Sequence, residues 1–170
     1  MNYTQDMNLL STSGYCMPFE EKDRDVQLTL RYGKQKHPKT GESFFHHGID
    51  FKTNNYFLAA VADGVVSGIG IDRKQYGLYV VIKYSKYEVT YSHMSNVFMQ
   101  FGQQVKAGLA VGVSSDLLHM EVKYDGEEID PVEFITMLYG NAKTWSEKGK
   151  AQPEFVAIDM DVHTDYDNDK

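Results

Sequence analysis

The sequence predicts an all-β fold with short peripheral helices, built on antiparallel strands. Aromatic residues make up 13 % of the 170 residues, with twelve Tyr and nine Phe, and such side chains favour strands. The apolar runs are short, and turn signals such as Asp63-Gly64 and Asp125-Gly126 separate them at roughly ten-residue spacing. Short strands at this spacing are typical of antiparallel sheets.

The composition limits both the organisation and the partners of the chain. A length of 170 residues with 42 % hydrophobic residues suits one domain with a single core. The net charge is −7 and no block of Lys and Arg is present, so nucleic acid and anionic membranes are not expected partners. The single cysteine, Cys16, excludes a disulfide within the chain.

The chain divides into three parts by composition. Residues 1–24 are expected to be a loosely held, polar lead-in, 25–140 the folded domain, and 141–170 a mobile acidic tail. The N-terminus lacks the basic start and apolar run of a signal peptide, and no stretch is long enough to cross a bilayer. Cytoplasmic action, export without a classical signal and prior removal of a leader therefore all stay open.

Alternating apolar residues predict the strands of the first half. Val26, Leu28 and Leu30 alternate with polar residues, which indicates a half-buried strand. Residues 34–42 contain Pro38 and Gly41 and are expected to form a turn. Asp63-Gly64 is a hairpin signal between two apolar strands. The expected strands are 25–31, 45–51, 56–61 and 65–69.

The second half continues the pattern and ends in a helix. Ser85-Lys86 and Asp125-Gly126 are expected turns between strands. After Asp130-Pro131, the apolar spacing of residues 132–139 fits a short helix. The expected strands are 78–84, 88–93 and 119–124, and shorter apolar stretches lie at 97–101 and 105–113.

Residues 45–51, Phe-His-His-Gly-Ile-Asp-Phe, carry the strongest chemical signal. In an extended segment His46, Gly48 and Asp50 lie on one face, because side chains alternate. Gly48 would leave the space between the imidazole and the carboxylate open for an ion. Zinc binds both ligand types, and a catalytic site takes three protein ligands with a fourth position open. His47 would point to the opposite face.

Two further histidines interrupt apolar strands, and they make a metal site more plausible. An unpaired buried imidazole nitrogen costs ~1–3 kcal/mol, so one such residue is usually a core histidine with a hydrogen-bond partner. His93 and His119 together with the pair on a third strand more plausibly converge on one metal ion. His119 is the best candidate for the third ligand. His37 and His163 are expected to be solvated surface residues.

Residues 32–136 resemble the catalytic domain of the M23 family of zinc metallopeptidases, the lysostaphin or LytM type. The segment 46–51 matches the HxGxDF signature, and the other matching segments also stand in the order of the family. The matching segments are Tyr32-Gly33 with His37-Pro38 and Thr40-Gly41, Ala62-Asp63-Gly64-Val65-Val66, Tyr91-Ser92-His93-Met94-Ser95, residues 102–108, His119-Met120-Glu121-Val122, and Asp130-Pro131.

The resemblance implies a sheet with an open groove that holds one Zn²⁺. Matching positions give the metal ligands as His46, Asp50 and His119, and give His93 a catalytic role. The family cleaves peptides of bacterial peptidoglycan, so the substrate is expected to be a wall peptide and the place of action the cell envelope. In such sites zinc polarises the scissile carbonyl and lowers the pKa of bound water.

One catalytic position departs from the family pattern. The first His of the HxH motif falls on Leu117, which can neither accept nor donate a proton. The loop before that strand, residues 112–116, is several residues shorter than is usual in the family. Zinc binding is therefore expected to be intact while catalysis is weakened. Asp116 or His47 could replace the missing base, although alternation points Asp116 away from the face of His119.

Three functional interpretations follow. The first is a zinc-dependent endopeptidase acting on cell-wall peptidoglycan with reduced activity. The second is an inactive relative that binds peptidoglycan or regulates a partner wall hydrolase. The third is a carrier of the biotinyl or lipoyl type, suggested by the Gly64-Val65-Val66 and Val105-Lys106-Ala107-Gly108 segments. No lysine lies in the hairpin where such a carrier needs one, which disfavours the third.

Overall fold

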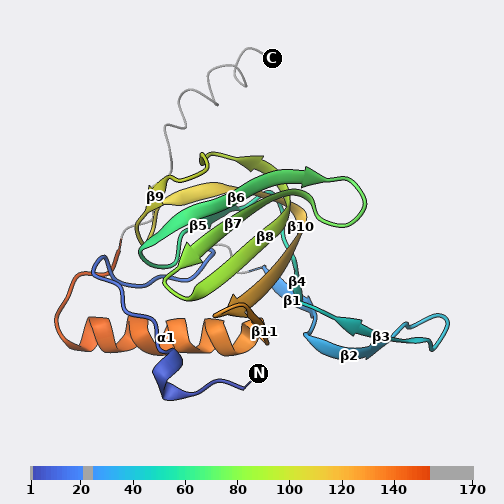
Figure 1. The fold of residues 1–170 in the computed structure, drawn as a ribbon, viewed down its shortest axis with the longest axis horizontal. Helices are drawn as coiled ribbons and strands as arrows, with labels where there is room; N and C mark the ends of the chain where they lie inside the picture. Colours follow the sequence, from blue (N-terminus) through green and yellow to red (C-terminus); the bar gives the residue numbers. More distant parts are fainter. Residues whose placement is uncertain (1, 21–24, 154–170) are drawn as a thin grey trace, which may run out of the picture.

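A computed structural model describes residues 2–20 and 25–153, and an antiparallel nine-stranded sheet dominates it (Figure 1). The sheet follows the order β1-β4-β10-β8-β7-β6-β9, with β5 and β11 also paired to β10. A separate sheet contains β2 and β3. The predicted all-β antiparallel class is confirmed. No helix among the described residues is long and apolar enough to cross a membrane.

The elements follow one another along the chain with short connections. They are η1 (Gln5–Met7), β1 (Gln27–Leu30), β2 (Gly33–Lys36), β3 (Ser43–His46), β4 (Ile49–Lys52), β5 (Phe57–Ala59), β6 (Gly64–Asp72), β7 (Gly77–Tyr84), β8 (Tyr87–Val97), β9 (Gln104–Val105), β10 (Ala110–Tyr124), β11 (Glu127–Ile129) and α1 (Pro131–Glu147).

The two faces of the central strands differ in chemistry. Met120 of β10 lies opposite Tyr91 of β8, which lies opposite Val80 of β7, and all three side chains are fully buried. The next residues along each strand point to the other face, because side chains alternate. There His119 lies opposite Ser92, and this face is polar and partly open. One face therefore builds the core and the other is available for a site.

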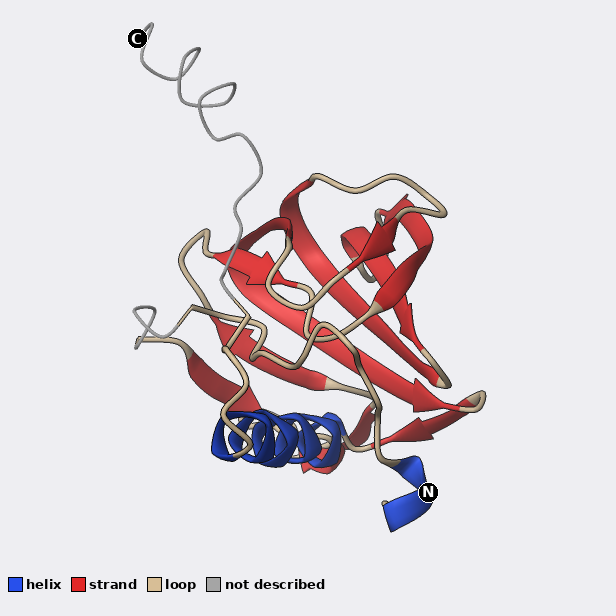
Figure 2. Cartoon of the chain, turned by 90° about the vertical axis from the view of Figure 1, so that its left-hand side faces the viewer, coloured by secondary structure: helices blue, strands red, loops and turns tan. Residues whose placement is uncertain are grey.

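Helix α1 and the N-terminal segment (residues 2–20) cover the apolar face (Figure 2). Asp130 caps the helix by accepting a hydrogen bond from the backbone N–H of Val132, and Pro131 occupies its first turn. Phe134 of the helix packs on Tyr87 with ring centroids 4.8 Å apart. The Tyr87 hydroxyl in turn donates to the backbone carbonyl of Met7 at 2.6 Å.

The description of residues 1–24 as loosely held is wrong for the part that the structure describes. Met7, Leu9 and Tyr15 are buried in the main core. Asp63 accepts hydrogen bonds from the backbone N–H and the hydroxyl of Thr12 at 2.9 and 2.8 Å. The segment was judged from its polar composition, whereas its few apolar side chains close one face of the sheet.

Two turn predictions are also wrong. Residues 34–42 were expected to be a turn, but Gly33–Lys36 and Ser43–His46 pair as a β-hairpin whose turn is confined to 37–42. Asp63-Gly64 was expected to join a hairpin, yet β5 pairs with β10 while β6 pairs with β7 and β9. The Asp63 carboxylate instead holds the N-terminal segment in place.

Several elements extend beyond the predicted bounds. β8 continues past its predicted end at residue 93 to Val97, and β10 begins at Ala110, before its predicted start at His119. Helix α1 continues to Glu147, past residue 140, where we expected the folded domain to end. The acidic run that was read as a mobile tail, including His163, lies outside the described residues from 154 onward, so the proposed domain division stays a prediction.

Candidate metal centre

Three strands bring His46, Asp50 and His119 together. Asp50 of β4 lies directly opposite His119 of β10 in the sheet register. The Oδ1 atom of Asp50 is 2.6 Å from Nδ1 of His119 and 3.3 Å from Nε2 of His46. One ligand atom from each residue lies within 4.8 Å of the others. The structure thus groups the three predicted metal ligands.

The predicted extended path through residues 45–51 is only partly correct. The chain leaves β3 after His46, bends at His47 and Gly48, and enters β4 at Ile49. A Cβ atom on Gly48 would lie 2.4 Å from the Met120 carbonyl oxygen and 2.8 Å from Cε1 of His119. Backbone and imidazole of β10 therefore fill the space that we assigned to the ion, and Gly48 is needed for close packing.

Hydrogen bonds on the far side of each imidazole orient it toward the cluster. Nδ1 of His46 lies 2.9 Å from the Arg31 carbonyl, which can only accept, so Nδ1 carries the proton and Nε2 is free to ligate. Nε2 of His119 lies 2.8 Å from the Glu121 carboxylate, which leaves Nδ1 directed at Asp50. The Tyr76 hydroxyl donates to Glu121 at 3.3 Å.

Glu121 and Tyr76 are supporting residues to which the sequence led us to assign no role. The signal for Glu121 was present, since residues 119 and 121 share one face of a strand. Tyr76 had no such signal, because it comes from the loop between β6 and β7. Its ring also stacks on His119, with centroids 6.2 Å apart and planes at 30°.

The carboxylates of the centre hold a proton on His119 that a bound cation would have to replace. Burial opposes ionisation of Asp50, but the hydrogen bond with His119 and the nearby imidazoles lower its pKa below the ordinary value. Burial disfavours a charged His119, yet hydrogen bonds to Asp50 and Glu121 outweigh this and raise its pKa to about 9. A divalent cation would displace that proton, because imidazole must be deprotonated to ligate.

His93 reaches the same centre through a backbone irregularity. It adopts a positive φ of 60°, where the pairing register of β8 with β10 shifts. Its backbone N–H donates to the carbonyl of Tyr76 at 2.8 Å. Strict alternation would have placed its side chain with buried Tyr91, but this bulge turns the ring to within 6.4 Å of the His119 ring centroid. Burial, together with the neighbouring His119, lowers the pKa of His93.

Neither suggested substitute for a second catalytic histidine reaches the cluster. Leu117 lies on β10 opposite Lys52 and is partly buried. Asp116, the next residue along the strand, is exposed, and alternation directs it away from the face of His119. Nδ1 of His47 lies 3.0 Å from the Glu128 carboxylate, and the side chain is 58 % exposed. His37 is exposed in the hairpin turn, as expected.

The donor set fits zinc. Two imidazole nitrogens and one carboxylate oxygen match the three-ligand arrangement that leaves a fourth position open. An open hollow of about 250 Å³ adjoins the centre on the polar face, where Tyr76, Tyr79 and Glu121 help to line it. The arrangement can therefore hold a divalent cation beside a neutral imidazole at a surface that a polymer could reach.

Comparison with known sequences places these features in a family. The sequence profile of Peptidase family M23 matches residues 44–131. An uncharacterized metalloprotease of Haemophilus influenzae is 29 % identical over 107 residues, which cover 58 % of this chain and 22 % of that protein. Murein hydrolase activator NlpD of Escherichia coli K12 is 31 % identical over 96 residues, 52 % of this chain and 25 % of NlpD. The chain thus spans about a quarter of the length of these curated relatives.

Solved structures have the same fold. A zinc containing peptidase from Vibrio cholerae superposes with a TM-score of 0.60 at 26 % identity, over 69 % of this chain and 39 % of that chain. The catalytic domain of lysostaphin from Staphylococcus simulans gives a TM-score of 0.58 at 20 % identity, over 69 % of this chain and 98 % of that chain. At that identity, the second match speaks for the fold alone.

Proposed function

Because the chain belongs to peptidase family M23, we propose that it is a zinc-dependent endopeptidase acting on peptide bonds of bacterial cell-wall peptidoglycan, with reduced activity. One observation carries the proposal. The ligand atoms of His46, Asp50 and His119 lie within 4.8 Å of one another. The imidazoles of His46 and His119 are also oriented toward that point by hydrogen bonds on their opposite sides. A chain that binds no metal would not require these orienting hydrogen bonds.

The residues of the chain divide the chemical work. His46, Asp50 and His119 would hold the zinc ion, while the Arg31 carbonyl and Glu121 keep the two rings in their ligating orientation. Zinc, when bound, polarises the scissile carbonyl and makes water a better nucleophile near neutral pH. His93, whose lowered pKa keeps its imidazole neutral at pH 7, can accept a proton beside this point.

Leu117 explains why the activity is expected to be low. A single general base or oxyanion donor contributes ~10²–10⁴ to the rate, and leucine supplies neither. Asp116 and His47 point away from the centre, so His93 is the candidate proton acceptor that remains of these three residues.

Leu117 and one group of relatives favour a second candidate function. The chain would bind peptidoglycan or regulate a partner wall hydrolase without cleaving peptides itself. NlpD of Escherichia coli, 31 % identical over 96 residues, is named a murein hydrolase activator. Both functions would place the chain at the cell envelope.

A turbidity assay on purified peptidoglycan, with and without a chelator, separates the two functions. The endopeptidase predicts slow clearing that the chelator abolishes, that added zinc restores, and that His93→Ala lowers without loss of metal. Absence of clearing by the zinc-loaded chain, combined with sedimentation of the chain with peptidoglycan, would reject the endopeptidase and favour the binding function.

A further inference from the structure

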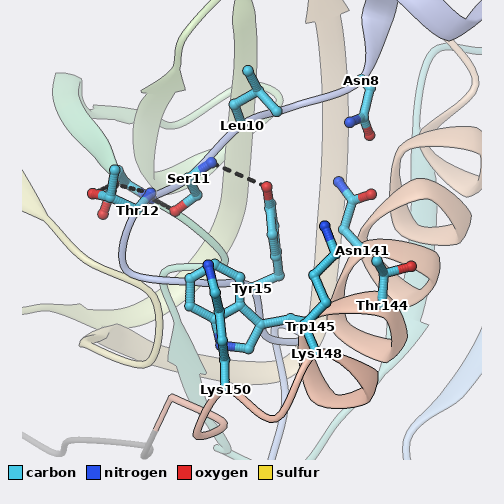
Figure 3. Close-up of a pocket in the computed structure, with 11 residues that line it drawn as sticks. Asn8, Leu10, Ser11, Thr12, Tyr15, Asn141, Thr144, Trp145, Lys148 and Lys150 are labelled. Carbon is cyan, nitrogen blue, oxygen red and sulfur yellow. Dashed lines mark hydrogen bonds between the residues drawn. The ribbon is translucent and has the colours of Figure 1, made fainter.

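A second concave site lies between the N-terminal segment and the C-terminal end of α1 (Figure 3). It has a volume of about 510 Å³, in the range of ligand-binding pockets. Leu10 and Thr12 line it from one side, and Asn141, Trp145 and Lys148 from the other. It shares no residue with the metal centre.

The lining of the hollow carries a net positive charge. Lys148 and Lys150 both contribute to the wall, and the one acidic lining residue is Asp63. The Asp63 carboxylate already accepts hydrogen bonds from Thr12 and Ser13. The last carbonyl groups of α1 are also occupied, since the backbone N–H groups of residues 148–150 donate to those of residues 144–146.

Trp145 gives the hollow a fixed aromatic wall. Its Nε1 donates to the Ala151 carbonyl at 2.9 Å, and its ring meets Tyr15 edge-on with centroids 5.8 Å apart. The ammonium group of Lys150 lies 4.4 Å from the centroid of the indole ring, where a cation–π interaction holds it. The positions of one cation and one apolar surface are therefore set before any ligand binds.

An adjoining hollow of about 820 Å³ extends the site along the start of β6. It shares Leu10, Thr12 and Asp63 with the first and adds two more lysines, Lys83 and Lys106. Leu10 stands between the two hollows with 82 % of its surface exposed. We call this surface the basic track, and its defining residues are Leu10, Lys83, Lys106, Trp145, Lys148 and Lys150.

The basic track sets four lysines against the single carboxylate of Asp63, in a chain whose net charge is −7. Within residues 2–20 and 25–153, none of its four lysines forms an ion pair. Electrostatic interactions are screened over about 8 Å at physiological salt, so a short bound segment would experience these lysines more than the remote acidic residues. A long polyanion such as nucleic acid would also meet the acidic remainder of the surface.

We propose that the basic track binds an extended acidic segment of a partner protein. Carboxylates of that segment would pair with the four lysines, and its intervening apolar side chains would pack on Leu10 and Trp145. The complementarity of charge, together with an exposed apolar ridge between two cationic hollows, favours this occupant over a small anion. The proposal uses no residue of the metal centre, so it can fail or succeed independently of the endopeptidase.

Trp145 makes the proposal directly measurable, because it is the only tryptophan in the chain. We would titrate the full chain with a blocked synthetic peptide of alternating Asp and Val and follow the emission of Trp145. The expected result is a saturable shift that weakens as salt is raised, and no shift with the matched peptide of Lys and Val. The double variant Lys148→Gln/Lys150→Gln should weaken binding by about tenfold.

Matched controls separate the basic track from general electrostatics. Lys34→Gln/Lys36→Gln removes the same charge from the β2–β3 hairpin and should leave the peptide affinity unchanged. Equal weakening by both double variants, or an equal response to the Lys-Val peptide, would overturn the proposal. Asp159→Asn/Asp161→Asn tests whether residues 154–170 of the chain itself occupy the basic track. If they do, the variant should bind the peptide more tightly, and that result would overturn the proposal that the occupant is a separate partner. Unchanged zinc content in every variant would show that these substitutions do not affect the candidate metal centre.

Discussion

The two halves of the candidate metal centre differ in how complete they are. The proposed metal-holding half consists of His46, Asp50 and His119, and each imidazole has a hydrogen bond on its far side that orients it. The proton-handling half consists of His93, which a bulge turns into place, and of position 117, where a leucine stands. The proposed metal-holding half therefore has three ligands with orienting hydrogen bonds, whereas the proposed proton-handling half has a single polar side chain.

Under the proposed function, holding a metal and moving a proton are separate requirements. Ligation needs lone pairs at fixed separations, which the direct pairing of β4 with β10 and the hairpin carrying His46 provide. Hydrolysis also needs a proton acceptor and a donor to the developing oxyanion. A substitution in either half should therefore change one property and spare the other.

The largest expected effect comes from completing the weaker half. Leu117→His should raise kcat/KM for a glycine-containing wall peptide by ~10²–10⁴, because it adds a proton-transfer group on the strand face of His119. The measurement is peptide hydrolysis at saturating zinc, followed by chromatography. Zinc content should not change.

Leu117→Asn is the control for this gain, since it adds polarity at the same position without a basic nitrogen. Its activity should stay near that of the wild type. If the wild-type chain is already as fast as Leu117→His, position 117 does not limit the reaction and our contrast between the halves is mistaken.

A smaller effect is expected from weakening the support of the stronger half. Glu121→Gln removes the charge that holds Nε2 of His119, and loss of such an outer contact costs 10–100-fold in metal affinity. We expect at least about tenfold weaker zinc binding in a competition titration. Glu128→Gln is the matched control, because Glu128 contacts His47 and Tyr32 outside the cluster. Equal affinities of the two variants would argue against orientation by Glu121.

Two glycines test how tightly the stronger half is packed. Gly48→Ala places a methyl group 2.4 Å from the Met120 carbonyl and should destabilise the fold by ~1–3 kcal/mol. Gly140→Ala, in α1 with nothing within 4 Å, should stabilise it by ~0.5–1 kcal/mol. Urea unfolding measures both, and a Gly48→Ala variant as stable as the wild type would contradict the packing at residue 48.

The smallest expected effect lies outside the centre, at Asp63. Burial raises its pKa, but hydrogen bonds from Ser13 and Thr12 outweigh this and lower it from the ordinary value of 3.8. Because the pKa of Asp63 is lower in the folded chain than in the unfolded chain, its ionised carboxylate stabilises the fold at pH values above the unfolded-state pKa. This stabilisation is lost as the pH falls through the folded-state pKa. Asp63→Asn should cost about 1 kcal/mol at pH 7 and progressively less toward acid. Urea unfolding across pH measures this, and a gap that widens toward acid would contradict it. Zinc affinity should not change.

The proposed ligands of the centre could be chosen from the sequence, whereas its backbone geometry could not. Two histidines in apolar strands beside the His46/Asp50 pair, together with the matches to the family motifs, indicated residues 46, 50 and 119. The bend at Gly48 and the bulge at His93 depend on the partner strand β10, which the local sequence does not specify. Tyr76 comes from a loop that carries no periodic signal, so its place over His119 could not be foreseen.

In the fold as well, features that the local sequence determines could be predicted, whereas features that depend on distant residues could not. Continuous or alternating apolar runs between turn signals located β7 and most of the other central strands. Such local signals failed at Asp63, whose turn signal is real but whose partners are Thr12 and Ser13, some fifty residues away. They also failed for the N-terminal segment, where Met7 and Leu9 are too few to form a pattern.

Zinc content tests the central claim most directly. The wild-type chain and His46→Ala would be purified without added metal, loaded with a small excess of zinc, desalted and measured by elemental analysis. The metal-holding half predicts about one zinc per wild-type chain and almost none in His46→Ala, with both chains folded by circular dichroism. A wild-type chain without zinc, or equal zinc in both chains, would contradict it.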